Sequence, residues 1–168
     1  MMEEIWGLLV VGYFIIMGCS ILMVIVKLII PQYIFSIEEV TEDKEQVFET
    51  VLHVIERDLG VRVNGLSINY DYSKNDELKG FYDPRNHSIT LFMDNMETVH
   101  SFVLTITEEI HHSIFVSSKS GMKLYQSYHR KVGYKNNPLE YSAKVYARDK
   151  FKSIHRNLKK SGLIRYKV

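Results

Sequence analysis

The sequence predicts an α+β domain behind a single transmembrane helix. A run of 22 uncharged residues, 5–26, opens the chain. Strand patterns are confined to the middle of the remaining sequence, and helical patterns lie on both sides of them. The 168 residues and the lone Cys19 suit one modest domain without a disulfide framework. We expect residues 1–33 to form the anchor, 34–40 a linker and 41–168 the folded domain.

The opening run has the properties of a membrane-spanning helix. About 20 apolar residues cross the hydrocarbon core as a helix, and Trp6 and Tyr33 lie near the ends, where aromatic belts occur. A cleaved signal peptide fits less well, because Glu3 and Glu4 replace the usual basic flank and no small-x-small cleavage site follows. We therefore expect a single-pass protein of the cell membrane.

The stretch around Cys19 leaves a lipid-anchored protein open as an alternative. Lys27 indicates on which side of the membrane the domain lies. The sequence IMGCS resembles a lipoprotein cleavage site, although the apolar run continues well past Cys19. Lys27 makes the C-terminal flank of the run the basic one. By the positive-inside rule the domain is then expected in the cytoplasm.

The domain itself is expected to begin with a helix over residues 41–59. Thr41 suits its N-cap, Gly60 suits its end, and apolar residues recur at helical spacing between them. Residues 61–72 then alternate β-branched and aromatic residues with polar ones, which predicts a strand.

Residues 80–94 predict two further strands around a turn at 83–86, the second strand covering 89–93. Asn95 suits the cap of a helix over 97–116, and 122–131 reads as another helix.

A last helix is expected from Pro138 to about residue 160. Asn137 suits its N-cap, and proline is favoured at the first helical position.

The stretch Thr105–Phe115, TITEEIHHSIF, nearly matches the H-E-x-x-H signature of zinc peptidases. Glu109 and His112 occupy its second and last positions, but Glu108 stands where the first histidine belongs. Side chains four residues apart share one face of a helix, so Glu108 and His112 are expected side by side. Glu140 follows 28 residues after His112 in the first turn of the last helix.

Three segments together resemble the minimal zincin-like metallopeptidases, a family found in phages and bacteria. They are GFYDPRNHSITLF, like the hairpin that borders the substrate cleft, EEIHH, and NNPLEYSAKVYA, like the segment that supplies a third glutamate ligand. The resemblance covers about residues 41–158. It implies a peptide or protein substrate and a divalent metal, zinc in the family. The metal ligands would be Glu108, His112 and Glu140, with Glu109 as the general base.

The replacement of histidine by Glu108 changes what the resemblance implies. Two carboxylates and one imidazole would neutralise a divalent cation, which weakens it as a Lewis acid and suits harder ions such as Mn²⁺ or Fe²⁺. A weakly active enzyme, an inactive relative and an unrelated domain all stay open. So does a second register of the motif, with Thr107 and His111 in the ligand positions.

Charge is split along the chain. Residues 1–110 hold 7 Lys and Arg against 18 Asp and Glu, whereas 111–168 hold 14 against 2. Two halves of one fold that pack together would explain this split. The alternative to an enzyme is a single-pass membrane protein whose basic C-terminal region binds a protein partner, anionic lipid or nucleic acid. Nucleic acid is the least expected of these, because the tyrosines among the cations match no known reader.

Overall fold

The computed structural model describes residues 38–40, 43–73 and 78–166. The chain divides into two compact units, Met1–Ser36 and Ile37–Val168, and the described residues belong to the second. That unit is α+β, as predicted. Its helices are α2 (Lys44–Leu59), α3 (Val99–Val116), α4 (Lys119–Val132) and α5 (Pro138–Lys160).

The main sheet is small and mixed. Strands β2 (Ser67–Asp71), β4 (Ser88–Phe92) and β3 (Gly80–Asp83) lie in the order β2-β4-β3. The first pair is parallel, with Ile68 opposite Ile89, and the second is antiparallel, with Tyr82 opposite Ile89. Among the described strands, β3 therefore has a hydrogen-bonded neighbour on one side only, and no described strand pairs with its other edge.

The turn between β3 and β4 forms where the sequence predicts it. Both carboxylate oxygens of Asp83 accept hydrogen bonds within it, from the backbone N–H of Arg85 and from the Asn86 amide, each at 2.9 Å. His87 closes the turn with a φ of 50°, and its Nδ1 lies 2.7 Å from the Tyr82 hydroxyl.

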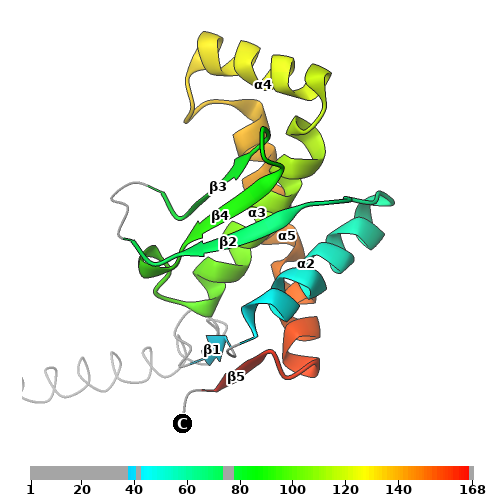
Figure 1. Cartoon of the computed structure of the whole chain (residues 1–168), viewed down its shortest axis with the longest axis vertical. Helices are drawn as coiled ribbons and strands as arrows, with labels where there is room; N and C mark the ends of the chain where they lie inside the picture. Colours follow the sequence, from blue (N-terminus) through cyan, green and yellow to red (C-terminus); the bar gives the residue numbers. More distant parts are fainter. Residues whose placement is uncertain (1–37, 41–42, 74–77, 167–168) are drawn as a thin grey trace, which may run out of the picture. The chain divides into compact units, whose positions relative to one another are not determined.

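The sheet lies on one side of α3, and α2 and α5 pack behind it (Figure 1). The core between these elements is apolar, with fully buried side chains from each of them. Examples are Phe48, Ile55, Ile89, Leu91, Ile106, Ile110, Ile154 and Leu158. Helix α4 has no buried residue and stands at one end of the unit (Figure 1). It contacts mainly α3.

Helices α2, α3 and α4 start at cap residues that the sequence analysis did not predict. Asp43 caps α2 by accepting from the N–H of Gln46, whereas the predicted cap Thr41 lies outside the described residues. Thr98 caps α3 by accepting from the N–H of Ser101, so the prediction for Asn95 was wrong. A 3-10 turn, Met93–Asn95, intervenes there. Ser118 starts α4 earlier than expected, and α5 begins at Pro138 with Asn137 as its cap, as predicted.

Part of the expected linker is a strand. Residues Glu38–Val40 form β1, which pairs antiparallel with β5 (Ile164–Tyr166). Neither strand was predicted, because three-residue strands carry too little alternation to be recognised.

The expected anchor at residues 5–26 lies outside the described residues. Within the described part, no helix is both long and apolar enough to span a bilayer.

The apolar stripe of the basic C-terminal helix belongs to the core. Phe151, Ile154 and Leu158 of α5 are at most 4% exposed. Their burial against the rest of the unit places this apolar stripe in the core, so the stripe is not available to enter a bilayer.

Candidate active site

Helix α3 carries the EEIHH segment through the centre of the unit. Its 18 residues confirm that the motif is helical, and Phe102, Val103, Ile106 and Ile110 hold it in the core. Because α3 packs on the sheet side against β3 and on the other side against α5, polar side chains between these contacts are enclosed. Glu109 and His112 are both 9% exposed.

Glu109 and His112 line one cavity of about 230 Å³ together with Glu140. We call it the central cavity. Its other walls come from β3 and the turn after it, from the end of α3 and from α4. They are Leu78, Gly80, Phe81, Tyr82, Pro84, Val116, Met122, Tyr125 and Tyr134. The cavity is thus mostly apolar and aromatic, with three ionisable groups converging in it.

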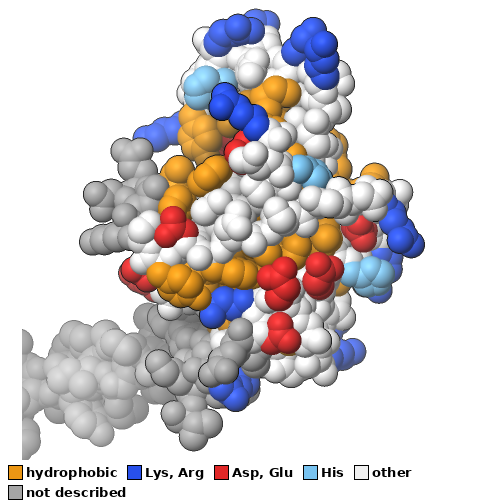
Figure 2. Space-filling view, viewed as in Figure 1, with side chains coloured by type: hydrophobic (Ala, Val, Ile, Leu, Met, Phe, Trp, Pro, Cys, Tyr) orange, Lys and Arg blue, Asp and Glu red, His pale blue; other side chains and the backbone are white. Residues whose placement is uncertain are grey.

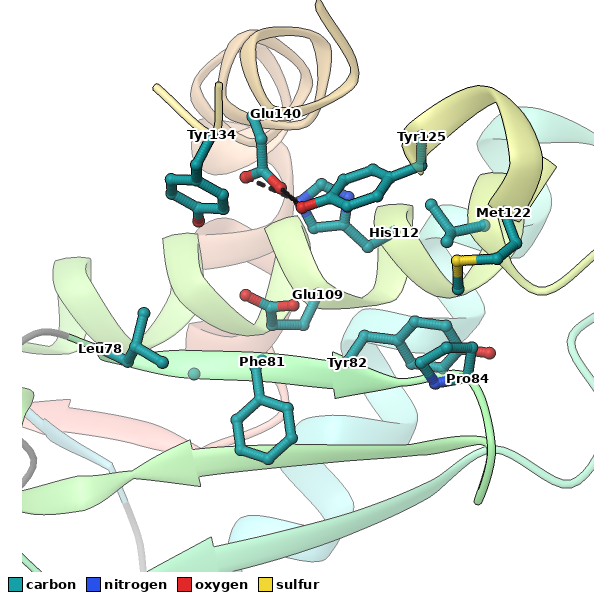
Figure 3. A pocket seen from close by; sticks show the side chains of 12 residues that line it. Leu78, Phe81, Tyr82, Pro84, Glu109, His112, Met122, Tyr125, Tyr134 and Glu140 are labelled. Carbon is teal, nitrogen blue, oxygen red and sulfur yellow. Dashed lines mark hydrogen bonds and ion pairs between the residues drawn. The ribbon is translucent and has the colours of Figure 1, made fainter. Parts of the chain in front are cut away.

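Glu140 reaches His112 because of how α5 starts. The Asn137 cap and Pro138 place Glu140 in the first turn, beside α3. Its Oε2 lies 3.4 Å from Nε2 of His112, and its Oε1 accepts a hydrogen bond of 2.6 Å from the Tyr125 hydroxyl. Figure 3 shows the three side chains meeting from α5, α3 and α4. The Tyr134 hydroxyl also bonds to Glu140.

These contacts favour the ionised form of each group. Burial alone would raise the pKa of Glu140, but His112 and the two tyrosine hydroxyls hold that pKa below its usual value. Burial alone would lower the pKa of His112, but the Glu140 contact and the charge of Glu109 raise it. An ionised carboxylate and an imidazole are therefore held together at a mostly buried position.

The pKa of Glu109 is shifted in the opposite direction to that of Glu140. It lies on the β3 side of the cavity (Figure 3), where burial raises its pKa to about 7. His112 and a hydrogen bond from the backbone N–H of Tyr82 lower the pKa, but not enough to compensate. A carboxyl group with a pKa near neutrality can both take up and release a proton at physiological pH.

Glu108, the predicted first ligand, lies in a neighbouring hollow. It is half-buried there beside Lys79, His100 and Lys144. Burial raises its pKa, and the Lys144 ammonium opposes the shift. The described part of the chain contains no group of three or more His, Cys, Asp or Glu side chains arranged to hold a metal. The structure thus brings together two of the three predicted ligands, His112 and Glu140.

The alternative register of the motif faces away from the cavity. The Thr107 hydroxyl donates to the backbone oxygen of Val103 at 2.7 Å. The ring of His111 packs between Phe115 and Tyr146, with centroid distances of 4.5 and 5.0 Å. Among the described side chains, its Nδ1 is the one buried polar atom without a partner, and burial lowers its pKa to about 4. Neither Thr107 nor His111 lines the cavity that contains Glu140.

The separation of His112 and Glu140 fits two ligands of one metal ion. A charge-assisted hydrogen bond between nitrogen and carboxylate oxygen is usually about 2.7–2.9 Å, so 3.4 Å is long for one. Two atoms bonded at about 2.0–2.2 Å to one tetrahedral zinc ion lie about 3.4 Å apart. Imidazole nitrogen and carboxylate oxygen are both ligands that zinc accepts. The pair therefore has the chemistry and spacing of two corners of such a site.

The sequence analysis missed the tyrosines of the cavity. Tyr125 and Tyr134 lie 15 and 6 residues before Glu140 and reach it only because α4 folds back over the end of α3. The aromatic residues between cations in KLYQSYHRKVGYK were visible as a pattern, but nothing in the pattern indicates a buried carboxylate as their partner.

No known family model, curated protein or solved structure matched the chain when it was compared with them.

Proposed function

We propose that this domain is a zincin-like, metal-dependent hydrolase that acts on peptides and is tethered to the cell membrane. The observation that carries the proposal is the central cavity. It combines a His112–Glu140 pair at metal-ligand spacing with Glu109, whose pKa is near 7, on a cleft beside the free edge of β3.

The free edge of β3 supports a peptide as the substrate. An edge strand presents unpaired N–H and C=O groups, and an extended peptide can pair with them as an additional strand. Gly80, Phe81 and Tyr82 of β3 all line the cavity, so a peptide on this edge would pass directly over Glu109 and His112. The apolar walls would receive its side chains.

The residues of this chain then have distinct roles. His112 and Glu140 would hold the metal, and Glu108, four residues before His112, would be the third ligand after its side chain turns from the neighbouring hollow. When bound, the metal would polarise the substrate carbonyl and make water a better nucleophile. Glu109 is positioned to take a proton from the attacking water and to pass it to the leaving nitrogen. Tyr125 and Tyr134 orient Glu140 and keep it ionised.

The glutamate at position 108 is expected to make the enzyme slow. Two carboxylates and one imidazole neutralise a divalent ion, whereas two histidines and one carboxylate leave a positive charge that activates water. A chain that binds peptides in the cleft without hydrolysing them is the alternative outcome.

Metal binding by the purified full chain tests the proposal. We expect about one equivalent of a divalent metal, measured by elemental analysis and by calorimetric titration with Zn²⁺ and Mn²⁺. Replacing Glu108 by His should tighten zinc binding on the order of tenfold and raise hydrolysis of a mixed peptide pool. Arg156→His, on the exposed face of α5, is the control. Failure of both wild type and Glu108→His to bind any metal would refute the proposal.

The tether is tested separately. The uncharged run of residues 5–26 predicts that the full chain stays with membranes after carbonate extraction. A reporter fused after Val168 should be active in the cytoplasm. Recovery of most of the chain in the soluble fraction would refute the tether and leave the hydrolase proposal standing.

A further inference from the structure

The central cavity is the middle part of a longer groove. It shares Gly80, Glu109 and Tyr134 with the hollow that contains Glu108. At its other end it shares Pro84, Val116 and Met122 with a hollow between the β3–β4 turn and the start of α4. Because Gly80 begins β3 and Pro84 follows its end, the three hollows succeed one another along the free edge of this strand. Four strand residues span about 13 Å, so the part of the groove beside β3 matches about four residues of an extended peptide, and the hollows at its two ends extend it further.

The hollow beyond Pro84 is basic. Arg85 from the turn and Lys119 from the first turn of α4 line it, together with Ser117, Ser118 and Gln126. We call it the basic hollow. Both cationic side chains are exposed, and neither is in a salt bridge with a described residue. No Asp or Glu is among the residues that line this hollow.

The carboxylate in the adjacent turn forms no ion pair with the cations of the basic hollow. Asp83 accepts the backbone N–H of Arg85 and the side-chain amide of Asn86 with its two oxygens, so both are engaged inside the turn. Helix α4 adds more positive charge, because Lys119–Val132 contains Lys and Arg but no Asp or Glu. In Figure 2 the Lys and Arg side chains gather over this end of the unit. A negatively charged group entering the basic hollow would therefore meet attraction from two sides.

We propose that the basic hollow is a specificity subsite that binds an acidic side chain of the peptide lying along β3. The proposal rests on the proposed function in one respect, that the cleft holds an extended peptide. A side chain from a peptide on the β3 edge reaches the hollow next to Pro84, while the residues before or after it fill the apolar central cavity. One carboxylate of Asp or Glu matches the two cations, Arg85 and Lys119, that face it across the hollow.

The expected preference is moderate because both cations are exposed to solvent. Exposed ion pairs contribute little each, so an acidic residue at the favoured position should improve affinity about five- to tenfold over its amide. The gain should shrink as salt rises from about 0.05 to about 0.5 M, since screening is strong at that ionic strength. A preference confined to one peptide position would separate a subsite from general attraction to a basic surface.

The experiment scans one Asp, and in parallel one Asn, through fluorescent alanine-based peptides of about eight residues that carry a leucine for the central cavity. Binding to the purified full chain is measured by fluorescence anisotropy, and cleavage of the same samples by mass spectrometry. We expect Asp to exceed Asn at one position only. The double variant Arg85→Gln, Lys119→Gln should abolish this advantage. Lys123→Gln with Lys131→Gln removes the same charge from α4 outside the hollow and should preserve it.

Each result decides between the two proposals. Peptides that bind or are cut with no preference for Asp at any position overturn the basic subsite and leave the hydrolase standing. A position-specific preference that depends on Arg85 and Lys119, without cleavage at any metal concentration, supports the subsite and counts against hydrolysis. If Asp binds better than Asn at every position and both double variants lose this advantage equally, general surface charge explains the preference, and the subsite is overturned. Absence of peptide binding overturns it as well.

Discussion

Replacing Glu109 by Gln should stabilise the metal-free protein, by an amount that grows as the pH rises above about 4.5. Glu109 is 9% exposed, and burial raises its pKa from 4.5 to about 7. Below about pH 4 the carboxyl is protonated in both folded and unfolded chains, so it makes no contribution that changes with pH. Between these two pKa values the unfolded chain releases the proton while the folded chain keeps it. The free energy of unfolding therefore falls as pH rises through this interval.

The magnitude follows from the two pKa values. Each pKa unit corresponds to about 1.4 kcal/mol, so full ionisation of Glu109 in the folded protein costs about 3 kcal/mol relative to the unfolded chain. Glutamine cannot ionise, and its amide oxygen can still accept the backbone N–H of Tyr82. At pH 8 the substitution should raise the free energy of unfolding by about 2–3 kcal/mol, or the melting temperature by about 10 °C. At pH 4 the difference should be near zero.

Thermal melts of the full chain at pH 4, 6 and 8, in the presence of a chelator, measure this effect. The control is Glu49→Gln, because Glu49 is exposed on α2 and its replacement should shift the melting temperature little at any pH. If Glu109→Gln has the same effect at pH 4 and pH 8, the carboxyl does not titrate in the buried environment described above. If it destabilises at pH 8, the ionised form makes favourable contacts that outweigh its burial.

Two further substitutions test how α4 is held over the cavity. Gly121→Ala should lower the melting temperature, although alanine normally favours a helix by about 1 kcal/mol. The added methyl would lie 1.9 Å from the backbone oxygen of Phe115, so α4 must move, and a higher melting temperature would contradict this packing. Tyr125→Phe removes the 2.6 Å hydrogen bond to Glu140 and should destabilise the protein by about 1–2 kcal/mol in urea at pH 7. The half-buried Tyr128 of the same helix, replaced by Phe, is the control, and equal losses in the two variants would exclude a special role for the bond.

The parts of the fold that could be predicted are those that local chemistry determines. Asn137 followed by Pro138 starts α5 for two local reasons. The Asn137 side chain caps the helix, and Pro138 lacks the backbone N–H that the first helical position does not use. The prediction for Asn95 failed although asparagine is a good cap. Its side-chain amide instead donates to the backbone oxygen of Leu78, 17 residues away. Strands β1 and β5 depend on a pairing between the two ends of the domain, which no local pattern contains.

The same distinction applies to the site. The helical spacing of the motif and the cap of α5 were sufficient to predict that His112 and Glu140 meet. They placed Glu108 beside His112 as well, whereas the structure places Glu108 in the neighbouring hollow. Burial separates Glu108 from Glu109, since Glu109 faces β3 inside the cavity and Glu108 faces Lys144 in the next hollow. That difference depends on the tertiary position of β3 and α5.

The charge split along the chain has a structural counterpart at the site. Acidic groups of the first part face basic groups of α5, as in the 3.0 Å salt bridge between Asp58 and Lys150 and in the approach of Glu108 to Lys144. Glu140 is one of only two acidic residues after position 110, and it is the one that is buried beside His112. His112 and the two tyrosine hydroxyls hold the pKa of this carboxyl below its usual value, so under the proposed function it would need no deprotonation to bind a cation. Glu109, enclosed on the β3 side of the cavity, has a pKa that burial raises to about 7. One cavity thus holds a carboxyl whose pKa is lowered and another whose pKa is raised, as the proposed roles of ligand and base require.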